Sequence, residues 1–129
     1  MDTSVFIDQV RSNKHAQRIN DLHYLIRNSS VVLSELSRGA TKREEVRFIQ
    51  QLVKNHPILT PPEGDWLQSG EILSKIYRKR GFNPQKLRDL HFDVLIALTA
   101  RRWGATLITS NREDFELIRP YVNAALEFW

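Results

Sequence analysis

Residues 93–118 read DVLIALTARRWGATLITSNREDFELI, and this stretch decides the fold class. Its apolar first part, residues 93–103, predicts a mostly buried helix that stops at Gly104. The compact segment 106–109 is β-branched and predicts a strand, and residues 111–118 predict a short helix. A strand placed directly between two helices is typical of α/β domains, in which helical crossovers join parallel strands.

The same alternation extends from this stretch to both ends of the chain. Short apolar or β-branched segments predict further strands at residues 3–7, 30–33, 57–60 and 125–129. No repeat, low-complexity segment or interdomain linker interrupts the pattern. We therefore predict a single α/β domain over residues 1–129, a three-layer α/β/α sandwich with a mainly parallel central sheet.

Helices are predicted between these strands from the spacing of apolar residues. The first helix is predicted over residues 19–26, and the second begins at a Thr41–Glu44 capping box. A third starts at Pro61 and Pro62 and ends near Gly81. The apolar positions expected to face inward on the last two are Val46, Ile49 and Val53, then Trp66, Leu73, Ile76 and Tyr77. Residues 82–90 are expected to form a loop.

Composition excludes several classes of protein. The absence of cysteine excludes disulfides, zinc–thiolate sites and thiol nucleophiles. No apolar run approaches the roughly 18 residues of a membrane-spanning helix, so we expect a cytoplasmic protein without membrane contact. The formal net charge of +4 favours polyanionic partners only weakly, because many basic proteins bind no nucleic acid.

Four acidic residues stand where an apolar segment gives way to a turn or a helix: Asp2, Glu35, Asp93 and Asp114. Right-handed crossovers bring the carboxyl ends of parallel strands to one edge of the sheet, so carboxylates placed there can converge. Taken singly, each has a structural explanation as a solvated charge or a helix-terminal residue. Four such placements in one chain favour a shared site for a divalent cation.

The sequences around these acids resemble the PIN-domain nucleases. Residues 2–8, DTSVFID, resemble the opening motif of that family, and Ser34-Glu35-Leu36 with Gly39 its second acidic motif. Residues 93–100, DVLIALTA, and 109–115, TSNREDF, are similar to its third and fourth motifs and are the most specific matches. The motifs follow the family's order over nearly the whole chain, and the subgroup most similar to it is the VapC-type toxins.

This resemblance implies an acidic Mg²⁺ or Mn²⁺ site, endoribonuclease activity, a homodimer and inhibition by a cognate antitoxin protein. Carried over position by position, the catalytic and metal-binding acids would be Asp2, Glu35, Asp93 and Asp114, supported by Thr109 and Asn111. Such chemistry is consistent with these residue types, because Mg²⁺ and Mn²⁺ prefer hard oxygen ligands. We expect Asp2 and Asp93 to be the primary ligands, and Glu35 and Asp114 to position water or a second ion.

The chain departs from the family pattern at its first acid, because only Met1 precedes Asp2. If a strand began at Thr3, Asp8 would be the acid at its end. We retain Asp2, because Asp8 in the resembling motif is ordinarily a helix-side residue. Among the basic residues, Arg112 is the best candidate for contacting RNA, since its loop also carries the proposed site.

Two rival functions remain open. A PIN-like binding module that has lost catalysis would share the fold, and the short N-terminus motivates that alternative. A receiver or phosphatase-like α/β domain would also gather acids at strand ends. It fits less well, because the first strand has no Asp-x-Asp pair and no lysine follows the strand at 106–109.

Overall fold

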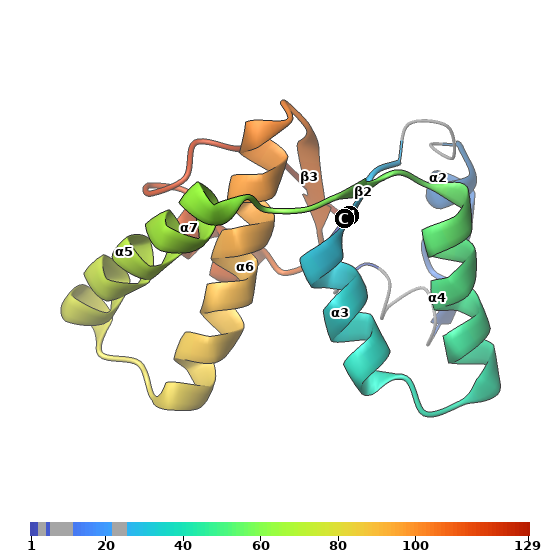
Figure 1. The fold of residues 1–129 in the computed structure, drawn as a ribbon, viewed down its shortest axis with the longest axis horizontal. Coiled ribbons are helices and arrows are strands. Elements are labelled where there is room, and N and C mark those ends of the chain that lie inside the picture. The colour runs from blue at the N-terminus through green and yellow to red at the C-terminus, as the bar shows by residue number, and fades with distance from the viewer. Residues whose placement is uncertain (3–4, 6–11, 22–25) are drawn as a thin grey trace.

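The structure, a computed structural model, describes residues 1–2, 5, 12–21 and 26–129. Its helices are α2 (Ala16–Asp21), α3 (Ser30–Gly39), α4 (Arg43–Asn55), α5 (Glu63–Arg80), α6 (Pro84–Arg102) and α7 (Arg112–Ile118). Its strands are β1 (Asn28–Ser29), β2 (Ile58–Leu59), β3 (Thr106–Thr109) and β4 (Ala125–Phe128). Figure 1 shows the strands between two helical hairpins, α3–α4 on one side and α5–α6 on the other.

Among the described residues, the strands form two parallel pairs, β1 with β2 and β3 with β4. The N-terminal dipeptide contacts both pairs. The Met1 amine donates to the Arg27 carbonyl, next to β1, over 3.5 Å, and the Asp2 amide donates to the Ile108 carbonyl of β3 over 2.7 Å. The predicted α/β class with parallel strands is confirmed, in a helix-rich form.

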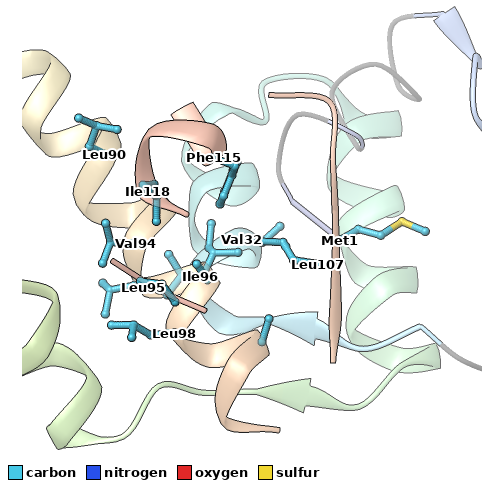
Figure 2. Close-up of a cluster of buried hydrophobic side chains, with 14 of the residues drawn as sticks. Met1, Val32, Leu90, Val94, Leu95, Ile96, Leu98, Leu107, Phe115 and Ile118 are labelled. Atoms are coloured by element: carbon cyan, nitrogen blue, oxygen red, sulfur yellow. The ribbon is translucent and has the colours of Figure 1, made fainter. Parts of the chain in front are cut away.

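The hydrophobic core is built around α6 (Figure 2). Leu90 and all residues from Asp93 to Ala100 are buried, so burial extends around the helix rather than along one stripe. A helix that is apolar on most sides is stable only when other elements cover it on most sides. The side chains that cover it include Val32 of α3, Leu107 of β3, and Phe115 and Ile118 of α7.

Polar contacts fix α5 against α6. The guanidinium of Arg102 donates from two nitrogens to the buried carboxylate of Asp65, at 2.7 and 3.0 Å. Ser69 Oγ lies 2.9 Å from His91 Nε2, and the edge of the Trp66 ring meets the His91 ring. His91 is therefore a packing residue of the helix pair.

The strand predicted at residues 30–33 is wrong, because these residues form the first turn of α3. Ser29 ends β1 and caps the helix, its hydroxyl accepting from the Val31 amide at 3.1 Å. Val31, Val32 and Leu33 are all buried, so their unbroken apolar run imitates a strand. Burial on several sides erases the helical period from a short segment.

The loop predicted at residues 82–90 is also wrong, because α6 already begins at Pro84. The side chain of Asn83 caps the helix by accepting from the Lys86 amide at 2.8 Å. Asparagine at the N-cap followed by proline in the first turn is a strong helix-start signal. The helix thus starts nine residues before Asp93, and the first two turns face the site described below.

Two details of the predicted helices require correction. The Thr41–Glu44 capping box is wrong, since α4 starts from Lys42 without a side-chain cap. Four of the positions predicted to face inward are instead exposed: Val46 and Val53 of α4, and Trp66 and Tyr77 of α5. Ile76 of α5, by contrast, is fully buried as predicted. The predicted helices, apart from these details, and the strands at 57–60, 106–109 and 125–129 are confirmed within a few residues.

Two predictions fall partly beyond the described residues. The strand at 3–7 and the alternative acid Asp8 lie outside them, apart from Val5, which is buried. The helix at 19–26 is described only to Asp21, as α2. Within the described part of the chain, no helix combines the length and apolarity needed to cross a bilayer.

Two glycines of the α5 region allow a matched test of the backbone. Gly81 ends α5 in the left-handed conformation, with φ at 65°, whereas Gly70 is an exposed position inside the helix. Gly81→Ala should lower the free energy of unfolding by about 1 kcal/mol, because a Cβ is strained there. Gly70→Ala should raise it by about 0.5–1 kcal/mol. Urea unfolding would check both variants. A change of the same sign in the free energy of unfolding for both would contradict the left-handed end of α5.

Candidate metal centre

Asp93 is the acid around which the site is arranged. It lies within the buried stretch of α6, next to Val94 and one helical turn beyond Leu90, and only 8% of its surface is exposed. A carboxylate at such a position loses its hydration, which is costly unless a cation or donors replace the lost water. Its placement on the core helix fixes its position relative to the rest of the fold.

The other three predicted acids all raise the pKa of Asp93. Burial, followed by the negative charges of Asp2, Asp114 and Glu35, raises the pKa of Asp93 to about 9, with a smaller contribution from a hydrogen bond to Asp114. Like charges raise the pKa of a carboxyl only when they lie close to it. The structure therefore brings together four acids that lie up to 112 residues apart in the sequence.

Asp2 is held at the site by β3. Its side chain is buried, with the residue 2% exposed, and its amide binds the carbonyl of Ile108. Thr109, the last residue of β3, donates its hydroxyl to Asp2 Oδ2 at 2.8 Å. The same hydroxyl oxygen accepts from the Asn111 amide at 2.9 Å. Thr109 thus connects the N-terminus to the turn that starts α7.

Asp114 is held in the first turn of α7 by Asn111. The Asn111 side chain caps the helix by accepting from the Asp114 amide at 3.3 Å. Its Nδ2 atom also donates to Asp114 Oδ2 at 3.0 Å. Thr109 and Asn111, which were expected to support the acids, therefore each hold one carboxylate. A negative side chain is also favourable at this end of a helix.

Lys86 is a residue of the site that sequence reasoning missed. Its ammonium lies 2.5 Å from Asp114 Oδ1, so both oxygens of Asp114 have a donor. The hydrogen bond to Asp114 is the main cause that raises the pKa of Lys86, and the charges of Glu113 and Asp93 also contribute. Lys86 is therefore the cation that the protein itself supplies to this cluster.

A sequence signal for Lys86 existed in the Asn83–Pro84 pair. Reading that pair as a helix start would have continued α6 back through residues 84–90. Lys86 would then have stood seven residues, two helical turns, before Asp93 and on the same face of the helix. Because residues 82–90 were predicted to be a loop, the shared helix face of Lys86 and Asp93 was not recognised.

Glu35 and Arg112 differ in their relation to the cluster. Glu35 is half-buried in α3 and lies close enough to Asp93 to raise its pKa. The Arg112 guanidinium lies 4.1 Å from the centre of the Phe128 ring and 3.7 Å from Glu116, and its side chain is 68% exposed. Its contact with RNA stays a prediction, because these contacts are with α7 and β4 rather than with the acids.

The cluster is not a ready-made ligand set. Among the residues that the structure describes, no three acidic or histidine side chains form a group that could hold a metal ion as they stand. Lys86 and Asn111 each donate to one oxygen of Asp114. A cation that bound beside Asp114 would be repelled by the Lys86 ammonium.

Comparison with known proteins identifies relatives of this chain at the level of family and fold. The sequence model of the PIN domain matches residues 1–119. No curated protein is similar enough to count as a match. Two solved structures share its fold over nearly the entire chain.

The first of these is the DNA-bound VapBC of Salmonella typhimurium. Its similar chain has a TM-score of 0.74 and 24% identity, with 99% of this chain and 95% of that chain covered. The second is VapBC2 of Rickettsia felis, bound to a DNA fragment from the promoter. Here the TM-score is 0.71 and the identity 22%, with 99% and 96% covered.

Asp93→Asn should change how stability depends on pH. A folded-state pKa of about 9, above the unfolded value, means that the folded protein holds a proton that the unfolded chain releases. Stability should therefore fall as pH rises from about 4 to 9, by up to roughly 1.4 kcal/mol per pH unit. The Asp93→Asn variant has an amide that stays neutral throughout, so it should lose this slope in urea unfolding at pH 5, 7 and 9 in EDTA.

The buried Met1 amine provides an internal control for that experiment. Its pKa is lowered to about 6, mainly by burial, so its contribution to stability is lost as pH falls through that value. This effect has the opposite sign and is present in both proteins. The difference between the two pH profiles therefore reports Asp93, and parallel profiles would contradict its raised pKa.

Thr109→Val tests the connection between β3 and Asp2. Valine keeps the shape of threonine but removes the hydroxyl that Asp2 and the Asn111 amide share. We expect a loss of about 1–3 kcal/mol in the free energy of unfolding, because buried groups lose a partner. Thr106→Val, at the exposed start of the same strand, is the matched control and should change stability little. A similar effect at both positions would show that the hydroxyl of Thr109 has no special role.

Proposed function

Because this chain belongs to the PIN domain family, we propose that it is a metal-dependent endoribonuclease and the toxin of a toxin–antitoxin pair. The observation that supports this proposal best is the position of Asp93, which is buried in the core helix with Asp2, Asp114 and Glu35 close enough to raise its pKa. Strongly perturbed groups of this kind concentrate at functional sites. A divalent cation bound among these carboxylates would reduce their mutual repulsion.

The residues present fit Mg²⁺ or Mn²⁺ by their chemistry. All four acids offer hard carboxylate oxygens, which both ions prefer over other ligands. Asp2 and Asp93 would be the principal ligands, with Glu35 and Asp114 completing the site. When bound, such an ion lowers the pKa of water and neutralises charge on a phosphate.

The protein's own polar side chains would orient this site. Thr109 keeps Asp2 in one orientation, and Asn111 does the same for Asp114. The backbone of β3 and the first turn of α7 carry these two residues, so the acids are supported by regular elements rather than by a free loop. Such support favours a fixed geometry for the attack of water on an RNA phosphodiester. Arg112, exposed beside α7, is proposed to contact the RNA backbone.

An antitoxin protein and a second copy of the chain are the proposed partners. The solved structures of similar fold are described as VapBC complexes, which motivates the antitoxin. An exposed apolar surface of this chain supports a protein partner. Val46 and Val53 of α4 are each more than 40% exposed, and within α4 only Leu52 is buried. Contiguous exposed apolar patches are typical of protein interaction sites.

RNA cleavage is the direct test of the proposed activity. Purified protein should cut RNA in Mg²⁺ or Mn²⁺ and leave it intact in EDTA. Asp93→Asn should reduce the rate by at least about a hundredfold, since a ligand of the cation would lose its charge. Asp89→Asn is the matched control, an exposed acid one turn earlier on α6, and should cut normally. An Asp93 variant with full activity would refute the assignment.

The partner proposal has a separate test. A small protein encoded beside this gene should bind the chain and block its RNA cleavage. Replacing Val46 and Val53 by serine should weaken that binding without affecting cleavage by the free protein. Binding that is insensitive to both replacements would place the antitoxin elsewhere.

A binding module without catalysis is the second candidate, and one observation favours it. The two oxygens of Asp114 are already occupied, and the described residues contain no ready group of metal ligands. Calorimetry with Mn²⁺ separates the candidates. A nuclease should show a site that Asp93→Asn abolishes, whereas an inactive module should show none.

A further inference from the structure

The carboxylate of Asp114 is enclosed by two donors from different elements. Lys86 Nζ, from the first turn of α6, lies 2.5 Å from Oδ1, and Asn111 Nδ2 lies 3.0 Å from Oδ2. Asp114 itself is buried, with only 10% of its side chain exposed. A cation that approached Oδ1 would therefore meet the Lys86 ammonium at close range.

Of the two donors, Lys86 is the one that can leave. Asn111 is fixed as the N-cap of α7, since its side chain also accepts from the Asp114 amide. The Lys86 side chain is 31% exposed and reaches the cluster from its rim. A lysine side chain has a flexible stem and can return its ammonium to water at low cost.

We propose that Lys86 is a positioning residue that competes with a divalent cation for Asp114. While the ammonium is in place, it keeps the carboxylate oriented and offsets part of the negative charge of the cluster. When a divalent cation binds, the ammonium withdraws toward solvent and Oδ1 becomes a ligand. This inference rests on the proposed metal site and adds a residue that controls its affinity.

The charges around Lys86 agree with such a competition. Its ammonium interacts favourably with Glu113 and Asp93 as well as with Asp114. The same negative charges would attract the divalent cation. Two cations that share one set of carboxylates repel each other, so binding of one weakens binding of the other.

The test measures Mn²⁺ binding by isothermal titration calorimetry, without any RNA. Lys86→Met keeps the length of the side chain and removes its charge. We expect the Kd for Mn²⁺ to fall by roughly 3- to 30-fold, the range expected when a partly exposed charged hydrogen bond is removed. Lys86→Arg retains the charge and should bind Mn²⁺ no more tightly than the natural chain.

Arg88→Met is the matched control for net charge. Arg88 lies on the same helix, exposed, and its guanidinium contacts Gln85 rather than the acids. Because residues two apart on a helix do not share a face, this variant changes the charge without touching the site. Its Kd for Mn²⁺ should stay within about twofold of the natural value.

A double-mutant cycle locates the competition at Asp114. In an Asp114→Asn background, Lys86→Met should no longer tighten Mn²⁺ binding, because the contested oxygen has lost its charge. Thermal unfolding provides a second readout. In EDTA the Lys86→Met variant should unfold at a lower temperature than the natural chain, and Mn²⁺ should raise its midpoint by more. If the Lys86→Met variant does not fold, Lys86→Gln, which keeps an N–H donor without the charge, is used in its place.

Each outcome decides between the hypotheses. If the natural chain binds no Mn²⁺, the proposed metal site fails and this inference fails with it. If the natural chain binds Mn²⁺ and Lys86→Met leaves the Kd unchanged or weakens binding, the competition is refuted while the metal site stands. Equal tightening by Lys86→Met and Arg88→Met, or a Lys86 effect that persists in the Asp114→Asn background, would also refute it.

Discussion

The repulsion between carboxylates around Asp93 is the constraint on which the rest of this structure depends. Burial and the charges of Asp2, Glu35 and Asp114 together raise its pKa to about 9. A cluster of this kind is destabilising by itself, because like charges are held close together away from water. The fold tolerates it since the same core helix that carries Asp93 is otherwise apolar and packed on most sides.

Polar neighbours hold the acids in place by hydrogen bonds. Thr109 donates to Asp2, and Asn111 and Lys86 donate to Asp114. Each donor belongs to the end or the start of a regular element, so its position follows from the fold rather than from a loop conformation. The result is a cluster in which Asp2 and Asp114 are each held in one orientation. In the function that we propose, a divalent cation would bind among these carboxylates and compete with Lys86 for Asp114.

The acids and the exposed apolar residues belong to different elements. The acids come from the N-terminus, α3, α6 and the first turn of α7, whereas Val46 and Val53 leave apolar side chains exposed along α4. In the α5–α6 hairpin the buried Asp65 is paired with Arg102, so burial of an acid does not by itself mark a functional site. What distinguishes Asp93 is that burial and the charges of three other carboxylates together raise its pKa.

The sequence alone determined the α/β class, the positions of most helices and strands, and the motifs that point to the PIN family, because these depend on local periodicity and short spacings. It misassigned residues 30–33, whose burial on all sides hides the helical period, and residues 82–90, where the helix-start signal of Asn83–Pro84 was not used. Only the tertiary structure decided that Asp2 and Glu35 stand near Asp93 and that Lys86 reaches Asp114. Such distances depend on how distant segments pack, and no local pattern of residues encodes them.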